Sequence, residues 1–234
     1  MRVGIMQPYF LPYIGYWQLM AAVDKYVVYD DVNYIKGGWI NRNRILLDGK
    51  PHYLNVPMLG SGSFKKINEI GVNNEEKLIQ KNLRMVEHAY KKAPYFEKVY
   101  PIIKQILECR KEILSEYIVE SFSIIKKYLM IDTELILSSQ QKKDCSLKGQ
   151  DKVIAICKLL GATEYVNAIG GQELYIYDDF EKAHINLFFL KTEDVIYKQF
   201  EHPFLCDLSI LDVMMFNSQD EIGEMLNKYV LITQ

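Results

Sequence analysis

The chain has 234 residues, a length that suits one large domain or two small ones. Apolar residues make up 49% of the sequence and charged residues 25%, a composition that can fill a core and is ordinary for a water-soluble globular protein. Twenty-eight Lys and Arg against thirty Asp and Glu give a formal net charge of -2. This balance argues against a protein held to duplex nucleic acid by phosphate neutralisation, and we expect no nucleic-acid partner.

Tyrosine is the most unusual part of the composition, because the chain has 17 tyrosines and only 10 phenylalanines. Tyrosine combines a flat apolar ring with a polar hydroxyl, so a surplus suits protein interfaces and polar pockets. The same surplus also suits a core whose rim is amphipathic. Both interpretations stay open at this point, and the first is compatible with a homo-oligomer.

The cysteines and the N-terminus bear on the cellular compartment. Neither a zinc or redox motif nor a secreted disulfide framework is indicated by the spacing of the four cysteines, Cys109, Cys145, Cys157 and Cys206. Gln7, Pro8 and Pro12 interrupt the N-terminal segment, which therefore lacks the apolar region of a signal peptide. No run approaches the roughly 18 apolar residues of a membrane span. We expect a cytoplasmic protein without a membrane span.

The first thirty residues predict a compact βαβ unit. Residues 3–6 form a short apolar run, residues 14–23 carry helical spacing, and residues 26–29 are β-branched or aromatic. A strand, a helix and a second strand within so short a segment are the minimal βαβ unit. The pattern predicts a parallel sheet with a right-handed crossover.

The middle of the chain departs from this alternation. Residues 44–47 and 52–56 flank an Asp-Gly pair, which predicts a β-hairpin over 44–56. Residues 75–130 then carry apolar stripes at helical spacing, enough for three or four helices. We expect residues 75–130 to form a helical insertion or subdomain beside the sheet.

The strand and helix alternation then resumes. It predicts strands over 134–137, 164–167 and 185–190, with a helix between the first two, and terminal helices over 208–216 and 221–229. The expected architecture is therefore a single α/β domain over residues 1–234, with a mostly parallel, Rossmann-like sheet interrupted by a β-hairpin and the helical insertion.

Polar residues follow four of the predicted strands directly. In open parallel sheets, ligands collect at the carboxyl ends of the strands, where loops and helix N-termini converge. The polar positions at these ends are Gln7, Asp30, Asp31, Ser138, Ser139, Asn167, Gly170 and Gly171. We expect one cleft bordered by Gln7, Asp30, Asn41, Arg42, Asn167 and Gly171. The alternative is that strand ends are polar in any case, with no shared pocket.

The segment between the first strand and the first helix contains two prolines and several aromatic residues, among them Tyr9 and Tyr13. A nucleotidylyltransferase-like domain has a similar layout, with a Pro-aromatic turn followed by a His-x-Gly-His sequence that opens a helix. Here Tyr13-Ile14-Gly15-Tyr16 occupies that place. Tyrosine cannot supply the imidazole donors of that motif, so adenylyl transfer by that route is not expected. A structural turn with aromatic packing is the alternative.

Two short segments carry candidate binding chemistry. Asp30 and Asp31 suit a divalent metal or sugar hydroxyls. Trp39 precedes a segment dense in directional donors, in which arginine forks suit phosphate or carboxylate and the indole suits stacking on a base or sugar. The donors of that segment are Asn41, Arg42, Asn43 and Arg44. An exposed basic edge strand that resists aggregation is the alternative interpretation.

The histidines indicate no metal site. None of them lies at ligand spacing from another: His52, His88, His184 and His202. His88 lies near the end of a predicted helix, where a positive charge is favourable, and it is also the best histidine candidate for a general base. No Ser-His-Asp order or nucleophile elbow is present, so no catalytic motif can be derived from the sequence.

Several segments together resemble one known family. The matching segments, which run from end to end of the chain in the same order, are Ile5–Tyr16, Asp30–Tyr34, Gly38–Arg44, Tyr90–Phe96, Tyr165–Asn167 with Gly170-Gly171, and Leu208–Asp212. On these residues the chain is similar to the WbqC-like protein family. The resemblance implies a role in bacterial surface-polysaccharide (O-antigen) assembly, beside enzymes that make nucleotide-linked amino sugars. It carries no catalytic motif over to individual residues.

Two classes of function follow from the resemblance and the candidate residues. The first is a transferase that places an acyl or aminoacyl group on the amine of a nucleotide-linked amino sugar, with Asp30, Asp31 or His88 as the base. Its substrate-binding residues would be Gln7, Tyr9, Tyr13, Trp39, Asn41, Arg42, Asn43, Arg44, Ser139, Asn167, Gly170 and Gly171. An acyl-CoA, a carrier-protein thioester and an activated amino acid are all compatible donors, and no cofactor is indicated.

The second class is a non-catalytic nucleotide-sugar binding or assembly protein, in which the tyrosine-rich loops form an interface. A metal-dependent hydrolase is a more distant third.

Overall fold

The structure is a computed structural model that describes residues 1–62, 64–201 and 203–233. Its central sheet has the strand order β10-β9-β8-β1-β2-β7, and every neighbouring pair is parallel except β9 with β10. These strands are β1 (Arg2–Met6), β2 (Lys25–Val28), β7 (Glu134–Leu137), β8 (Glu164–Ala168), β9 (Asn186–Thr192) and β10 (Tyr229–Ile232). The prediction of a mixed α/β fold with a mostly parallel sheet is therefore confirmed.

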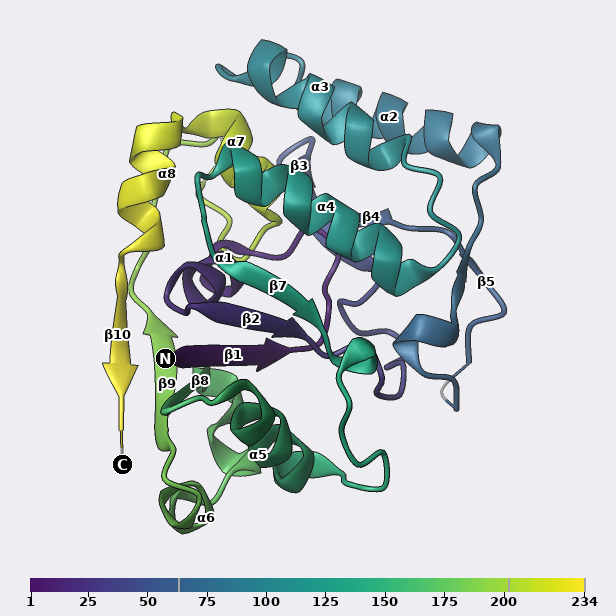
Figure 1. Cartoon of the computed structure of the whole chain (residues 1–234). Helices are drawn as coiled ribbons and strands as arrows, with labels where there is room; N and C mark the ends of the chain where they lie inside the picture. The colour runs from purple at the N-terminus through teal and green to yellow at the C-terminus, as the bar shows by residue number, and fades with distance from the viewer. Residues whose placement is uncertain (63, 202, 234) are drawn as a thin grey trace.

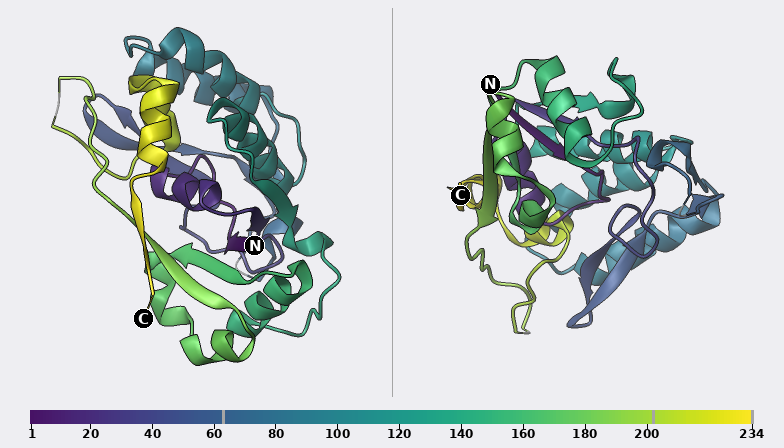
Figure 2. Two further views of the ribbon diagram at one scale, coloured as in Figure 1. Left: turned by 60° about the vertical axis from the view of Figure 1, so that its left-hand side comes forward. Right: turned by 90° about the horizontal axis from the view of Figure 1, so that it is seen from below.

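The helices cover the two faces of this sheet unequally (Figure 1). One face carries α5 (Gly149–Leu160) and α6 (Tyr177–Lys182), whose apolar side chains form one core cluster with the strands. The other face carries the larger cluster, with side chains from α1 (Ile14–Ala21), α2 (Glu76–Tyr90), α3 (Phe96–Leu107), α4 (Leu114–Tyr128), α7 (Ile210–Phe216) and α8 (Gln219–Leu226). Figure 2 shows α5 and α6 on the side of the sheet away from the other helices.

Aromatic rings pack α1 and α4 onto the sheet. Tyr16 of α1 lies with its ring centroid 5.6 Å from that of Tyr26 in β2 and 5.5 Å from that of Phe122 in α4. Trp17 contacts the same Phe122 at 5.6 Å, and all four side chains are almost fully buried. Burial of rings of this size is the main favourable contribution to holding these layers together.

The middle of the chain forms two short antiparallel ribbons and a helical segment. β3 (Arg42–Leu47) pairs with β4 (Lys50–Asn55) around Asp48 and Gly49, whose φ angles are +50° and +73°. Positive φ at both turn positions is the geometry that favours Asp-Gly in a hairpin. β5 (Met58–Leu59) and β6 (Gly71–Val72) flank the short 3₁₀ helix η1 (Ile67–Glu69), and α2, α3 and α4 then occupy most of the expected helical segment, 75–130.

The C-terminal end differs from the prediction. Residues 221–229 were expected to be one helix, but α8 ends at Leu226 and Tyr229 begins β10. Lys228 donates its backbone N–H to the carbonyl of Met225, which closes the end of the helix. The four residues of β10 are aromatic or aliphatic and pair antiparallel with β9, so sheet pairing outweighs the helical periodicity there.

A buried hydrogen-bond network joins the helical layer, the hairpin and the segment before α7. Asp212 of α7 is fully buried, and its Oδ1 accepts from the hydroxyl of Tyr90 in α2 at 2.8 Å. The same hydroxyl accepts from the backbone N–H of Leu46 in β3 at 2.9 Å. Asp212 Oδ2 accepts from the Tyr197 hydroxyl at 2.7 Å and from Gln199 Nε2 at 2.9 Å. One carboxylate thus links three parts of the chain.

We expect Tyr90→Phe to lower the free energy of unfolding by about 1–3 kcal/mol, because it leaves a carboxylate oxygen of Asp212 and the Leu46 N–H buried without a partner. Urea unfolding at pH 7 measures the change. Tyr117→Phe is the matched control, since its ring is equally buried but its hydroxyl bonds to no described residue. Equal losses in the two variants would show that the network contributes nothing beyond ring packing.

Candidate functional site

The loop that leaves β1 is held in a tight turn. Tyr16 donates its hydroxyl to the carbonyl of Gln7 at 2.9 Å, and Trp17 Nε1 donates to the carbonyl of Pro12 at 3.2 Å. Leu11 adopts a φ of +43°, an uncommon conformation for a residue with a branched side chain. The helix that follows therefore fixes both ends of the loop that carries Tyr9 and Tyr13.

Two buried polar side chains tie this loop to neighbouring segments. Asn43 of β3 donates its side-chain amide to the carbonyls of Phe10 and Leu11, at 3.2 and 2.9 Å. Ser209, at the start of α7, donates its hydroxyl to the Leu11 carbonyl at 2.8 Å, and its N–H donates to the carbonyl of Arg44 at 2.8 Å. The loop after β1, the hairpin and the segment before α7 therefore meet at one place.

A cavity of about 330 Å³ lies where these segments meet. Its lining residues are Tyr9, Tyr13, Trp39, Asn43, Arg44 and Asp207. Five of these six were candidate substrate-binding residues from the sequence, and Asp207 was not. We call this the smaller cavity.

The Tyr13 ring forms one wall of the smaller cavity, and Gly15 explains its position. A Cβ on Gly15 would lie 2.6 Å from a carbon of the Tyr13 ring and 2.6 Å from Oγ1 of Thr192 in β9. Only glycine permits this approach without a shift of its neighbours. Burial raises the pKa of Tyr13, and the nearby charge of Asp207 raises it further.

Arg44 supplies the positive charge of the smaller cavity. Its Nη2 donates to the backbone carbonyl of Asp207 at 3.2 Å, and its guanidinium carbon lies 5.4 Å from the centre of the Trp39 ring. Its Nε is buried and bonds to no residue in the described part of the chain. A buried guanidinium N–H without a partner is an unsatisfied donor, which is unfavourable for stability.

A stack of rings and guanidinium groups continues from Arg44 along the hairpin. The ring centroids of Trp39 and Tyr53 are 6.2 Å apart, and the guanidinium carbon of Arg42 lies 4.3 Å from the centre of the Tyr53 ring. Arg42 and Arg44 share one face of β3 because side chains alternate along a strand. We call this row, Arg44–Trp39–Tyr53–Arg42, the cation–π row.

A second cavity, of about 610 Å³, lies at the Arg42 end of the cation–π row. We call it the larger cavity, and its lining residues are Tyr34, Lys36, Gly37, Asn41, Arg42, Asn55, Met58, Ser61, Gly62 and Phe64. Lys36 and Arg42 are its charged lining residues, so it favours an anionic ligand. Arg42 also donates from Nε to the Gly38 carbonyl at 3.1 Å and from Nη2 to the Gly37 carbonyl, which leaves Nη1 for a ligand.

The aspartates after β2 lie at the carboxyl edge of the sheet, outside both cavities. Asp30 is 1% exposed, and its two oxygens accept from the backbone N–H and the hydroxyl of Ser139 at 2.9 and 2.6 Å. Ser139 belongs to the 3₁₀ helix η2 (Ser138–Gln140) that follows β7. Asp30 therefore caps this helix from the neighbouring strand.

Asp31 forms a compact ion cluster with two lysines. Its Oδ2 lies 3.0 Å from Nζ of Lys143 and 2.9 Å from Nζ of Lys152, and its Oδ1 accepts from the Ser138 hydroxyl at 2.7 Å. The lysine side chains are only 3% and 8% exposed. Burial by itself raises the pKa of Asp31, but the hydrogen bonds from Lys152, Ser138 and Lys143 outweigh it and hold the pKa below its ordinary value. A carboxylate held ionised in this way is a weak base.

The end of β8 carries a third group of candidates. Asn167 is buried, and its Oδ1 accepts from the backbone N–H of Ala168 at 2.8 Å. A Cβ on Gly171 would lie 2.8 Å from Asn167 Nδ2, so Gly171 and Asn167 are immediate neighbours. Gly170 lies beside them in the 3₁₀ helix η3 (Ile169–Leu174). These three residues line neither of the two cavities.

The remaining candidates lie apart from one another. His88 is 62% exposed, and its Nε2 lies 3.7 Å from Asp48 at the hairpin turn. Six residues of extended chain, about 20 Å, separate Asp48 from Arg42. Of the six residues expected to border one cleft, Asn41 and Arg42 share the larger cavity, while Gln7, Asp30, Asn167 and Gly171 line neither cavity.

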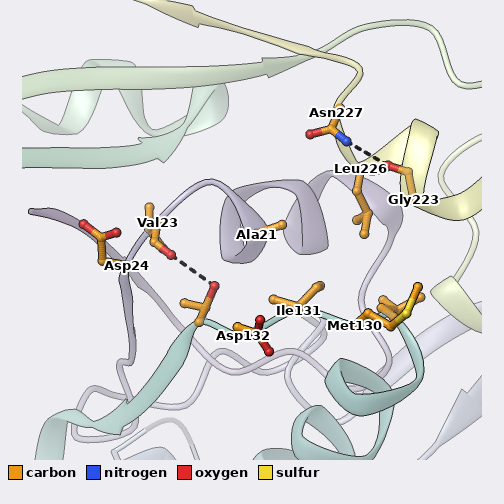
Figure 3. A pocket seen from close by; sticks show the side chains of 11 residues that line it. Ala21, Val23, Asp24, Met130, Ile131, Asp132, Gly223, Leu226 and Asn227 are labelled. Atoms are coloured by element: carbon orange, nitrogen blue, oxygen red, sulfur yellow. Dashed lines mark hydrogen bonds between the residues drawn. The ribbon is translucent and has the colours of Figure 1, made fainter.

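A further cavity of about 560 Å³ opens at the opposite edge of the sheet (Figure 3). Asp24 and Asp132 line it, where the chain enters β2 and β7, together with residues at the ends of α1, α4 and α8. Its lining includes no lysine, arginine or histidine. It therefore lacks the cations that a diphosphate requires, and it lies at the edge away from the usual ligand position of a parallel sheet.

Neither a group of metal ligands nor a membrane-spanning helix is found among the described residues. Within residues 1–62, 64–201 and 203–233, no three His, Cys, Asp or Glu side chains gather as metal ligands would, and His202 lies outside these ranges. No helix in the same part of the chain has the length and apolar character that crossing a membrane requires.

Comparison with protein families decides the identity of the chain. The model of the WbqC-like protein family matches residues 7–224, which include both cavities and the cation–π row. The chain belongs to the WbqC-like protein family. This WbqC-like protein is also 28% identical over 228 residues to "Uncharacterized protein Rv1507c" of Mycobacterium tuberculosis, an alignment that covers 96% of this chain and 97% of that one. No solved structure matches the chain.

Several charged residues around the cavities and Asp31 of this WbqC-like protein were not among the candidates from the sequence. Asp207 and Lys36 line the cavities, and Lys143 and Lys152 bind Asp31. Each is a single charged residue in a loop or on a helix surface of ordinary composition. The sequence gives one indirect indication, since Asp207 adjoins Leu208–Asp212, one of the segments on which the family resemblance rests.

We expect Asp31→Asn to lower the free energy of unfolding by about 3 kcal/mol at pH 7, because two buried lysines lose their counter-charge. The pKa of Asp31 is lowered in the folded state. The contribution of its charge is therefore present above the ordinary pKa of a carboxyl group and is lost as the pH falls through the lower, folded-state value.

Urea unfolding of the wild type and the variant at pH 7, 5, 4 and 3 measures this dependence. The difference between the two proteins should be largest at neutral pH and should shrink in acid. Asp132→Asn is the control, because Asp132 is exposed and forms no ion pair with a described residue. A difference that is constant over the whole range would contradict the ionised cluster.

Proposed function

We propose that this WbqC-like protein transfers an acyl or aminoacyl group to the amine of a nucleotide-linked amino sugar, in the assembly of a bacterial surface polysaccharide such as the O-antigen. The carrying observation is the pair of cavities at the two ends of the cation–π row. A transfer reaction needs two substrate sites, and these cavities lie at the two ends of one row of side chains. One of them is cationic, as a diphosphate requires.

The larger cavity suits the nucleotide-linked sugar. Its volume of about 610 Å³ lies within the usual range for small-molecule sites. Lys36 and Arg42 can bind the diphosphate, and the side-chain amide of Asn55, whose own hydrogen bond to Tyr53 is long at 3.4 Å, can bind a base or sugar hydroxyls. The exposed ring of Phe64 at its rim offers a stacking surface.

The sheet topology supports this placement. Across the sheet the parallel strands follow the order β7-β2-β1-β8-β9. Numbered by their appearance along the chain, this order is 3-2-1-4-5, which favours a Rossmann-like interpretation. The direction of winding then changes between β1 and β8, and the loop after β1 carries Tyr9 and Tyr13 into the smaller cavity. The nucleotidylyltransferase-like alternative shares this layout, but Tyr13-Ile14-Gly15-Tyr16 lacks the histidines of that chemistry.

We propose that residues 1–234 form one α/β domain with a helical insertion over 75–130. In support, side chains of α2, α3 and α4 belong to the same apolar cluster as side chains of the sheet and the hairpin. A separate subdomain would have its own core.

The proposed reaction needs no further reagent. The nitrogen of the neutral sugar amine attacks the carbonyl carbon of the donor, a C–N bond forms, and the bond from that carbon to the leaving group breaks. The proton lost by the nitrogen leaves with the thiol or other leaving group. The positive charge of Arg44, which lines the smaller cavity, can stabilise the oxygen on which negative charge develops. An acyl-CoA, a carrier-protein thioester and an activated amino acid all fit this scheme.

One observation favours the second candidate function, a non-catalytic nucleotide-sugar binding or assembly protein. Asp30, Asp31 and His88, the bases expected from the sequence, line neither cavity. A protein that only binds the nucleotide sugar requires the cations of the larger cavity and no base.

We expect Arg42→Ala to weaken binding of a nucleotide-linked amino sugar about ten- to hundredfold, because a charge-assisted contact to the diphosphate is lost. Arg42→Lys should recover only part of the affinity, since it restores the charge without the bonds to Gly37 and Gly38 that hold the guanidinium in place. Calorimetry against a panel of nucleotide amino sugars measures both, with Arg84→Ala, at an exposed site on α2, as the control.

Mass spectrometry of the same mixtures with an added acyl or aminoacyl donor tests the reaction, whose product is an amide. Equal binding by the wild type and both Arg42 variants, with folding intact, would show that the diphosphate is not bound there. Binding without an amide product from any donor of the three types would favour the non-catalytic function.

A further inference from the structure

The charge of the chain is distributed very unevenly. Residues 32–67, which contain the hairpin and β5, carry six Lys and Arg and a single acidic residue, Asp48, a formal charge of +5. The rest of the chain, with 22 Lys and Arg against 29 Asp and Glu, therefore carries -7. The acidic residues that flank the segment are engaged, since Asp31 is paired with two lysines and Glu69 accepts from the backbone N–H of Lys66. A slightly acidic protein thus has one strongly basic part.

Most of the exposed positive charge in this segment belongs to lysines. Arg42 and Arg44 are half-buried and lie against aromatic rings. The other four cations are exposed, and none of them forms an ion pair with a described residue: Lys36, Lys50, Lys65 and Lys66. Their charges are free to attract an anionic partner.

The same segment exposes a large amount of apolar surface. Of the twelve large apolar side chains that are exposed among the described residues, five belong to it: Ile35, Trp39, Tyr53, Leu59 and Phe64. The Phe64 side chain is 98% exposed. A ring in this state gains nothing from folding, and its transfer from water to an apolar environment would be favourable.

Two of these apolar side chains lie beside two of the lysines at the opening of the larger cavity. Tyr34 donates its backbone N–H to the carbonyl of Lys65 at 2.9 Å, which places Ile35 and Lys36 beside the loop that carries Phe64. Lys36 and Phe64 both line the larger cavity. Apolar and basic side chains therefore alternate around one opening.

Leu59 completes this group. It follows Met58, which lines the same cavity, and a Cβ on the next residue, Gly60, would lie 3.1 Å from Nζ of Lys65. We call the group the basic rim, and its members are Ile35, Lys36, Leu59, Phe64 and Lys65. Figures 1 and 2 show the loops around β5 at the end of the molecule away from β10, where a broad surface can approach them.

We propose that the basic rim docks this WbqC-like protein onto the surface of an anionic lipid bilayer. The lysines attract the negative headgroups, and the apolar side chains enter the boundary between headgroups and acyl chains. This mode of attachment needs no spanning helix. It goes beyond the proposed function and does not depend on it.

The form of the basic rim favours a bilayer over a protein partner. The core of a protein interface is a continuous apolar surface that packs against a matching one. Here lysines and glycines separate the apolar residues, as in Ile35–Gly38 and Leu59–Lys65. A bilayer needs no matching pocket, so single side chains can enter it at separate points. The half-exposed rings of Trp39 and Tyr53 are of the type that is enriched at the membrane–water interface.

Sedimentation with lipid vesicles measures the docking. We expect the wild type to bind phosphatidylcholine vesicles that contain about one third phosphatidylglycerol about tenfold or more tightly than vesicles of phosphatidylcholine alone. Raising NaCl from about 0.1 M to about 0.5 M should weaken the binding, because salt screens the attraction of the lysines.

Two substitutions separate the apolar and the electrostatic contributions. Phe64→Ala should weaken binding to the anionic vesicles about tenfold, since one ring no longer leaves water. Lys65→Gln should weaken it about fivefold, since one charge is lost. Lys65 lines neither cavity, and both side chains are exposed, so folding should be unchanged.

The controls are matched substitutions on the α5 and α6 side of the sheet. Leu174→Ala, at a side chain that is 70% exposed in η3, and Lys158→Gln, at an exposed site on α5, should leave vesicle binding unchanged.

Tryptophan fluorescence tests insertion directly. In Phe64→Trp, the additional emission should shift to shorter wavelength when anionic vesicles are added, because the indole leaves water. Leu174→Trp, compared with the wild type in the same way, should show no shift.

Binding to anionic vesicles that depends on Phe64 and Lys65, with the fluorescence shift, would support the proposal. Equal binding to both kinds of vesicle, binding to neither, or binding that Phe64→Ala and Lys65→Gln leave unchanged would overturn it. Short single-stranded RNA is the other anionic polymer to include, since rings beside cations also suit stacked bases. Binding to this RNA without binding to anionic vesicles would assign the basic rim to nucleic acid and would likewise overturn the bilayer assignment.

Discussion

A carboxylate that folding removes from water needs hydrogen-bond donors, and those of Asp212 come from segments far apart in the chain. Tyr90 comes from α2, while Tyr197 and Gln199 come from the stretch between β9 and α7. The hydroxyl of Tyr90 also accepts from the backbone of the hairpin. Desolvation at this site still exceeds the effect of these donors, and the pKa of Asp212 is raised in the folded state. Burial of this carboxyl group therefore carries a cost to stability, and the return is a fixed relation between hairpin, helix and loop.

The smaller cavity depends on that relation. The hairpin supplies Arg42, Asn43 and Arg44, and the segment before α7 supplies Asp207. Neither segment belongs to the central sheet, whose own packing would leave their relative position free. The Asn43 and Ser209 side chains complete the connection by binding the carbonyl groups of the loop after β1. A parallel sheet thus carries a site built largely from parts outside it.

The sequence was sufficient for the sheet and for part of the site. Apolar runs such as residues 3–6 and 26–28 identify buried strands, because burial on both faces leaves no room for polar residues. Trp39, Asn43 and Arg44 were recognisable as a group, because they crowd directional donors around a single ring. Asp207 was not recognisable, since a lone aspartate in a loop looks the same whether or not it faces a cavity.

Pairing between elements accounts for the other differences. The helical periodicity of residues 221–229 gave no indication that Tyr229 would pair with the edge of β9. The carboxyl ends of the strands were expected to form one cleft, but Asp30 and Asp31 are satisfied by Ser139 and by two lysines that arrive from later in the chain. Which donors bind a given carboxylate cannot be predicted before the fold is known.

The cation–π row has an optical consequence. The chain has two tryptophans, of which Trp17 is fully buried and Trp39 is 38% exposed. Trp39 lies between the guanidinium group of Arg44 and the ring of Tyr53, and its indole lines the smaller cavity. A collisional quencher in solution reaches this indole while Trp17 stays shielded. The protein therefore contains an intrinsic fluorescent reporter in the wall of its smaller cavity, with an internal reference in its core.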